Sequence, residues 1–164
     1  MLLYPFIIFW GLKEGVSLRF LSLFLIVGFI CVFFRLKKQI VLLLGAILLV
    51  GLFVSNDPIF IRLYPVCMNM LFASSFLLSL KETPLIEVFA RKMGKEIDEK
   101  AKNYTYKATV AWGLFLSLNA LISLITVFLS LEIWMCYNGF LSYILIGIVS
   151  VSEYFIRKRI EQCS

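Results

Sequence analysis

The sequence predicts an all-α fold, namely a polytopic transmembrane helical bundle of five full spans and a short N-terminal apolar helix, with five or six crossings in total. Apolar residues make up 62% of the 164 positions and charged residues only 16%. Soluble domains are about 45–50% apolar and about 25% charged. The apolar residues also form runs long enough to cross about 30 Å of hydrocarbon as helices, which pair every backbone polar group. We therefore interpret residues 1–164 as a single integral membrane domain.

The first apolar segment, Leu2–Leu12, is shorter than the roughly 20 residues that a full span needs. It lacks the basic leader and small-residue cleavage site of a signal peptide, so we expect it in the mature protein. A short tilted span, a half-membrane insertion and an interfacial segment are the alternatives for it. The five longer segments follow in the order Leu18–Phe34, Gln39–Val54, Ile59–Leu80, Ala108–Leu131 and Ile133–Phe155.

The distribution of basic residues predicts the orientation, because lysine and arginine stay on the cytoplasmic side of a membrane. With six crossings, thirteen of the sixteen basic residues fall on one side, and only Lys13, Arg19 and Arg62 fall on the other. The C-terminus is therefore predicted to be cytoplasmic, and the N-terminus joins it only if the first segment spans. We attribute the net charge of +6 to this topology and to anionic lipid headgroups, and we expect no nucleic-acid partner.

Residues 81–107 are predicted to form a cytoplasmic connector that contains one short amphipathic helix. Thr83 is the expected N-cap, Pro84 the first helical residue and Gly94 the stop. Glu87 falls on the polar face of this helix. Arg91 and Lys92 fall on the same polar face and flank the apolar one. The apolar face carries Leu85, Ile86, Phe89 and Met93. An interfacial helix on the membrane, a solvated connector whose apolar stripe packs on the bundle, and a partner-docking site are the alternatives.

Four polar side chains inside the predicted spans are candidate functional positions: Arg62, Asn69, Asn119 and Asn138. Arg62 and Asn69 are seven residues apart and would share a helix face about two turns apart. The asparagines serve either as polar contacts between helices or as the lining of a polar path or headgroup pocket. Acidic residues are expected only near the membrane boundaries, which argues against proton-coupled active transport.

Two patterns of small residues predict close helix packing. Gly113 and Ser117 form a small-xxx-small pair, and Gly139 and Gly147 lie eight residues apart on one helix face. Both patterns fit packing within one chain and packing in a homo-oligomer.

The absence of histidine excludes Ser-His-Asp and Cys-His catalytic units and imidazole metal sites. The four cysteines are isolated in the sequence and show no metal-ligand spacing. We therefore predict no catalytic residue, no cofactor and no metal site.

Three stretches carry a family resemblance: NDPIFIR at Asn56–Arg62, KETPLIE at Lys81–Glu87 and AWGLFLSLNAL at Ala111–Leu121. Over nearly the whole length, the chain resembles the bacterial intracellular septation protein A family. It resembles more closely a related group of uncharacterised bacterial integral membrane proteins, often encoded beside fatty-acid-like or aryl-polyene biosynthesis genes. The long charged stretch 96–107 departs from the septation pattern and favours this second group.

The resemblance implies a multi-pass protein of the bacterial inner membrane, non-enzymatic, that acts as a scaffold or accessory factor in envelope or lipid-like metabolite biosynthesis. Its expected partners are membrane lipids, anionic headgroups on the cytoplasmic side, and envelope or biosynthetic enzymes. A small lipid or metabolite carrier or flippase-like component is the alternative. An integral membrane transferase is a third, with Asp57 and Arg62 as the nearest approach to a reactive cluster.

Overall fold

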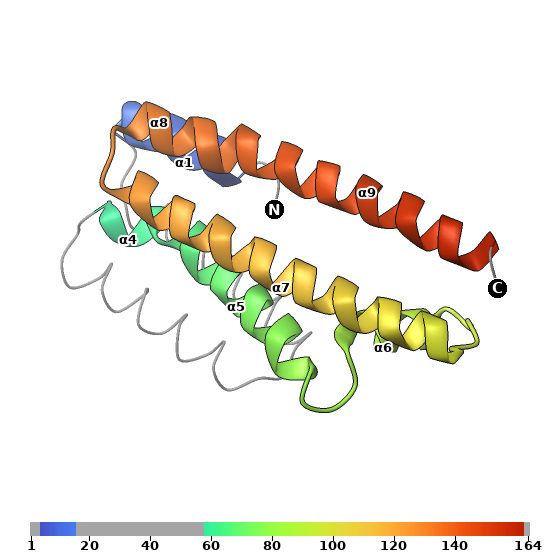
Figure 1. Ribbon diagram of the computed structural model, residues 1–164. Coiled ribbons are helices and arrows are strands. Elements are labelled where there is room, and N and C mark those ends of the chain that lie inside the picture. The colour runs from blue at the N-terminus through green and yellow to red at the C-terminus, as the bar shows by residue number, and fades with distance from the viewer. Residues whose placement is uncertain (1–3, 16–57, 163–164) are drawn as a thin grey trace. The chain divides into compact units, whose positions relative to one another are not determined.

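The computed structural model describes residues 4–15 and 58–162, and every regular element in these two ranges is a helix (Figure 1). The all-α class is therefore confirmed for the described part of the chain. The predicted spans Leu18–Phe34 and Gln39–Val54 lie outside the described residues.

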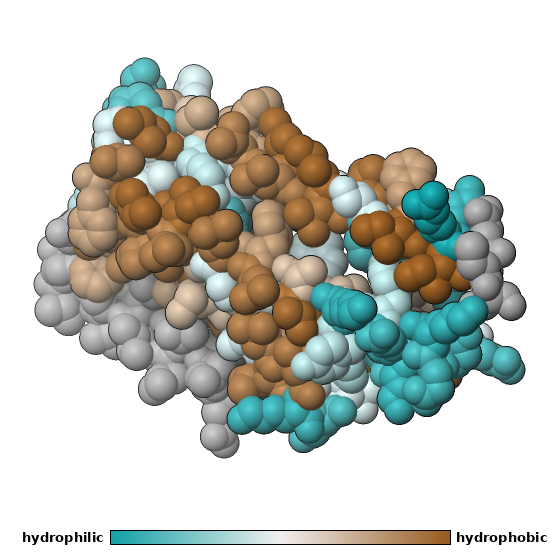
Figure 2. All heavy atoms as spheres, in the orientation of Figure 1, coloured by the Kyte–Doolittle hydropathy of each residue, from teal (hydrophilic) through white to brown (hydrophobic). Residues whose placement is uncertain are grey.

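Three helical segments are long and apolar enough to cross a membrane: Ile59–Ser79, Glu99–Val127 and Leu131–Ile160. Each overlaps one of the predicted spans that fall in the described ranges. Large apolar side chains on these helices stay exposed, among them Leu118, Ile125 and Phe155. Figure 2 shows hydrophobic side chains over much of the visible described surface and hydrophilic ones gathered near α6 (Leu85–Lys92) and the start of α7 (Glu99–Val127). Apolar outer surfaces are typical of helices whose solvent is lipid.

The first of these segments consists of two helices, α4 (Ile59–Arg62) and α5 (Tyr64–Ser79). Pro65 explains the division. It has no N–H to donate to the carbonyl of Ile61, four residues earlier, so one helical hydrogen bond is missing at this point. Arg62 is therefore the last residue of α4, and the uninterrupted helix expected between Arg62 and Asn69 is divided.

The second segment, α7, starts earlier than the predicted span Ala108–Leu131. Asp98 begins it as an N-cap, because its Oδ1 accepts a hydrogen bond of 2.7 Å from the N–H of Ala101. Residues 99–107 of the predicted connector are therefore helical. With 29 residues, α7 is about 43 Å long, which exceeds the roughly 30 Å of the hydrocarbon core. Its charged first turns therefore extend beyond the apolar layer that the rest of the helix can cross.

The third segment joins α8 (Leu131–Cys136), η1 (Tyr137–Leu141) and α9 (Ser142–Gln162). The hydroxyl of Ser130 starts α8 by accepting from the N–H of Ile133 at 3.4 Å. The element η1 is a π-helical turn, a wider form of helix that is frequent at functional sites. The helical run is longer at both ends than the predicted span Ile133–Phe155.

The short N-terminal apolar helix is present as α1 (Tyr4–Lys13). Its ten residues give a length of about 15 Å, half the thickness of the hydrocarbon core. Ile8 is fully buried, and α1 lies against α8 and η1 (Figure 1).

The chain divides into two compact units, which we describe separately. Unit 1 comprises Met1–Met68 and Ala120–Ser142, and unit 2 comprises Asn69–Asn119 and Tyr143–Ser164. The described core of unit 1 includes Ile8, Ile61, Val127 and Trp134, and that of unit 2 includes Leu71, Ala73 and Leu116.

Within unit 2, α5 and α7 approach each other closely at Gly113. A Cβ atom placed on Gly113 would lie 2.5 Å from Cδ2 of Leu77, whereas one placed on Gly147 would meet no atom within 4 Å. The ring of Phe76 stacks on that of Trp112, with centroids 6.1 Å apart. The small residue at position 113 therefore serves packing within the chain.

Candidate functional site

The helix α6 is held in unit 2 by two hydrogen bonds from its own backbone. The Leu85 N–H donates to Oγ of Ser79 at 3.0 Å, and the Ile86 N–H donates to Oγ1 of Thr109 at 3.3 Å. Both N–H groups lie at the start of the helix, where no intrahelical carbonyl can accept them. Hydroxyls from the end of α5 and from α7 thus fix the position of α6.

The predicted N-cap of α6 is wrong by one residue. Pro84 occupies the N-cap position and makes no side-chain capping hydrogen bond. Thr83 is not needed as the cap, because Ser79 and Thr109 satisfy the first N–H groups. At the other end Gly94 has a φ of +74°, the left-handed backbone expected of a helix stop.

The inward side of α6 carries Glu87 and Ala90, which are 3% and 8% exposed, while Phe89 and Met93 are 47% and 61% exposed. Glu87 was expected on the polar face. It is buried instead because Arg91, one turn later, pairs with it: Oε1 of Glu87 accepts from Nε at 2.9 Å and from Nη2 at 2.7 Å. The two largest apolar side chains of the stripe therefore point outward.

The other predicted residues of this helix differ in exposure. Leu85 and Ile86 are half-buried, while Arg91 and Lys92 are exposed. Basic side chains thus lie on the same short helix as outward apolar ones, which is the arrangement of helices that rest on a membrane surface.

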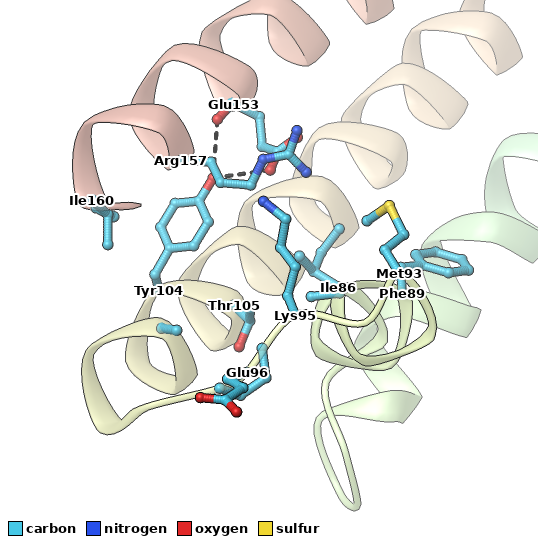
Figure 3. A pocket seen from close by; sticks show the side chains of 13 residues that line it. Ile86, Phe89, Met93, Lys95, Glu96, Tyr104, Thr105, Glu153, Arg157 and Ile160 are labelled. Carbon is cyan, nitrogen blue, oxygen red and sulfur yellow. Dashed lines mark hydrogen bonds between the residues drawn. The ribbon is translucent and has the colours of Figure 1, made fainter. Parts of the chain in front are cut away.

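A cavity of about 410 Å³ lies next to α6 (Figure 3). Residues of α6, of the stretch 95–97, of the first turns of α7 and of the C-terminal part of α9 line it. Its volume falls within the roughly 300–1,000 Å³ typical of small-molecule sites. Charged side chains on the wall come from Lys95, Glu96, Glu153 and Arg157. The apolar lining includes Ile86, Phe89, Met93, Ile97, Ala101 and Ile160.

One wall of the cavity is fixed by a contact between α7 and α9. The hydroxyl of Tyr104 lies 3.0 Å from Oε1 of Glu153 and 3.1 Å from its backbone oxygen, and donates its proton to these acceptors (Figure 3). Tyr104 was missed as a site residue because 96–107 was interpreted as a connector. Helix formers follow Asp98 directly in the sequence, and this signal would have placed Ala101 and Tyr104 on one helix face.

The predicted intramembrane asparagines Asn69 and Asn119 are brought together in unit 2. Nδ2 of Asn119 donates to Oδ1 of Asn69 at 3.0 Å. Asn119 is 2% exposed. This pair joins α5 to α7 in the way that polar side chains join helices in lipid.

The predicted polar residue Arg62 binds the C-terminal end of α7 in unit 1. Its Nη2 donates to the carbonyl oxygens of Thr126 at 2.9 Å and Leu129 at 2.6 Å, and its own carbonyl accepts from Nε1 of Trp134 at 3.1 Å. A cation at the end of a helix satisfies its last carbonyls and opposes the negative end of its dipole.

Asn138, in η1, completes this network in unit 1. Its Nδ2 lies 3.0 Å from both Oγ1 of Thr126 and the carbonyl oxygen of Trp134, and its Oδ1 accepts from Oγ of Ser123 at 2.7 Å. Asn138 and Ser123 are 4% and 0% exposed. The asparagines therefore take part in two separate sets of hydrogen bonds, and none of them lines the cavity beside α6.

In the part of the chain that the structure describes, no three histidine, cysteine, aspartate or glutamate side chains lie close enough together to hold a metal ion. Cys67 and Cys136 are free thiols. The cavity can hold a molecule that is largely apolar and carries a small polar or charged group.

The described residues thus define a helical protein with three helical segments long and apolar enough to span a membrane. A cavity lies beside α6 and the charged first turns of α7. Comparisons with family models, curated proteins and solved structures find no match to this chain.

Proposed function

We propose that this chain is a non-enzymatic, multi-pass protein of the bacterial inner membrane that acts as a scaffold or accessory factor in envelope or lipid-like metabolite biosynthesis. Its α6 helix lies on the anionic cytoplasmic leaflet. The observation that carries this proposal is the exposure of Phe89 and Met93 beside Arg91 and Lys92, while Glu87 and Ala90 are buried.

The exposed apolar stripe favours the interfacial alternative for α6 over a solvated connector. A connector packed on the protein would bury its largest apolar side chains, and here they are the exposed ones. Insertion of such side chains into the interface is favoured by the hydrophobic effect, and neighbouring basic residues add attraction to anionic lipid.

The orientation of the proposal rests on the basic residues. The side that holds α6 also holds thirteen of the sixteen lysines and arginines when six crossings are counted. The positive-inside rule assigns this side to the cytoplasm. The sequence resemblance to septation protein A-like proteins supports the bacterial inner membrane and the role in envelope or lipid-like synthesis.

The position of α6 is tested in vesicles that contain phosphatidylglycerol brominated on its acyl chains, which quenches nearby tryptophan. We expect Phe89→Trp to add quenched fluorescence over the parent protein, which has three tryptophans. Lys92→Trp, on the exposed basic side of the same helix, is the matched control and is expected to add unquenched fluorescence. Equal quenching of both variants, or of neither, would contradict an interfacial α6.

The scaffold role is tested by crosslinking the tagged full-length protein in cells and purifying it in mild detergent. We expect enzymes of envelope or lipid-like metabolite synthesis among the crosslinked proteins, identified by mass spectrometry. Phe89→Glu combined with Met93→Glu should reduce their yield, whereas Thr83→Glu with Asn103→Glu adds the same charge at exposed polar positions and should not. Recovery of no such enzyme in any sample would overturn the scaffold role.

A further inference from the structure

We infer that the cavity beside α6 binds one alkyl chain that ends in an anionic group, such as a carboxylate or a phosphate. This inference rests on the proposed membrane position of α6 and names the ligand class of the same region.

The lining of the cavity fits an alkyl chain. Phe89 and Met93 from α6, Ala101 from α7 and Ile160 from α9 contribute apolar surface to a volume of about 410 Å³. Transfer of an alkyl chain from water to such surface is favourable, because it removes apolar area from water. An alkyl chain has no polar groups along its length, so it needs no hydrogen-bond partners from the apolar wall.

The charges around the cavity fit an anionic end group. Lys95 and Arg157 contribute the two cations of the wall. Of the two carboxylates, that of Glu153 accepts a hydrogen bond from Tyr104, and that of Glu96 points away from Lys95 and Arg157 in Figure 3. The stretches 91–107 and 153–159 together contain nine basic and four acidic side chains. The surrounding potential is therefore positive and attracts anions.

The location of the cavity suits an amphiphile that arrives from the membrane. Its walls are formed where α7 extends beyond the length needed to cross the hydrocarbon, and by the outward stripe of α6. A chain with a charged end partitions to this depth, because its apolar part stays in lipid and its head stays at the surface. The chain and the head can then meet the apolar wall and the two cations at the same time.

The test uses the full-length protein in discs of phosphatidylcholine with a fatty acid that carries a photoactivatable diazirine on its chain. We expect labelling of peptides that contain Ala101 and Ile160. The fatty alcohol of the same chain length should label these peptides about tenfold less, because it lacks the charge that the two cations would pair with.

Two pairs of variants locate the chain and the head. Ala101→Phe fills the cavity and should abolish labelling by the acid, whereas Lys102→Phe adds the same ring at the exposed neighbouring position and should not. Lys95→Gln with Arg157→Gln should reduce labelling by the acid about tenfold and leave labelling by the alcohol unchanged. Lys92→Gln with Arg159→Gln removes two exposed charges outside the cavity and should preserve labelling.

A second arm replaces the fatty acid with photoactivatable phosphatidylglycerol and so distinguishes a free amphiphile from a bilayer lipid as the source of the chain. Labelling of the Ala101 and Ile160 peptides by either anionic probe supports the inference. Equal labelling by acid and alcohol, or persistence of the label in Ala101→Phe, overturns it. Neither result depends on co-purified enzymes, so failure of this site and failure of the scaffold role are separate outcomes.

Discussion

The asparagine side chains in the apolar helices are hydrogen-bonded to protein partners. Asn119 is bonded to Asn69, and Asn138 to Ser123 and Thr126. In lipid, a side chain that loses such a partner has no water to replace it. These residues therefore contribute to stability through their pairs.

Replacement of Asn119 tests whether its pair is a packing contact. We expect Asn119→Leu to lower the free energy of unfolding in detergent by about 1 kcal/mol or less, with cellular function retained, because interhelical hydrogen bonds average about 0.6 kcal/mol. Asn69→Leu combined with Asn119→Leu should recover part of the loss, since it leaves no unpaired amide. Loss of function with an unchanged melting temperature would instead favour a polar path through this residue.

Asn138 should be more costly to replace. Asn138→Leu removes the partner of the Ser123 hydroxyl and both contacts of Nδ2, so we expect a loss of about 1–3 kcal/mol. Ser150→Ala is the control, because the Ser150 hydroxyl bonds only to a carbonyl of its own helix among the contacts described, that of Ile146. Unfolding titrations of both variants in detergent measure the difference. A similar free energy of unfolding for the two would contradict a structural role of the network.

At the scale of the element, the packing of α5 on α7 depends on Gly113. We expect Gly113→Ala to lower the free energy of unfolding by about 1–3 kcal/mol, because the new methyl group would overlap the side chain of Leu77. Gly147→Ala enters open space and removes a helix-breaking residue, so it should be neutral or stabilising by up to about 1 kcal/mol. Equal effects would mean that Gly113 does not set the approach of the helices.

The sequence predicted the existence of these elements better than their ends and faces. Apolar runs and Gly94 located the long helices and the end of α6, because hydrophobic periodicity and φ > 0 are local properties. The N-cap of α7, Asp98, could have been recognised from the sequence, but the charged stretch around it was interpreted as a connector. The division of the helix near Pro65 could also have been predicted, because proline cannot donate a helical hydrogen bond. The π-helical turn at Asn138 was not predicted; there the Asn138 side chain bonds to Ser123 and Thr126, which lie 15 and 12 residues earlier in the sequence.

The candidate site shows the same limit. Residue spacing identified the apolar stripe of α6, but its direction depends on hydroxyls of Ser79 and Thr109 and on the Glu87–Arg91 pair. Glu87 is buried although it is charged, because Arg91 satisfies it. The cavity requires α6, α7 and α9 together. No local pattern encodes a meeting of segments about fifty residues apart.

At the scale of the whole molecule, charge and apolar length together determine where each helix end lies. The basic residues are concentrated in two stretches, 81–107 and 157–159. The first stretch contains α6, and residues of both stretches line the cavity. Moving one of these clusters across a membrane would require taking several charges through hydrocarbon, at roughly 2.5–3.5 kcal/mol for each. The clusters are therefore expected on one side, and the positive-inside rule predicts that this side is the cytoplasm.

Reporter fusions test this orientation directly. A fluorescent protein that matures only in the cytoplasm should be active when fused after Ser164, and alkaline phosphatase, which is active only after export, should be active when the chain is truncated and fused at Ser130. The exchanged reporters should be inactive at both positions, because each works on one side only. Substituting Arg157, Lys158 and Arg159 by glutamine should weaken the C-terminal preference, whereas Glu161→Gln, which removes no basic charge, should not. An exported C-terminus in the unmodified protein would reverse the orientation and move α6 and its cavity to the outer face.

A reporter placed before Met1 then distinguishes five crossings from six: it shares the side of the C-terminus only if the first apolar segment spans.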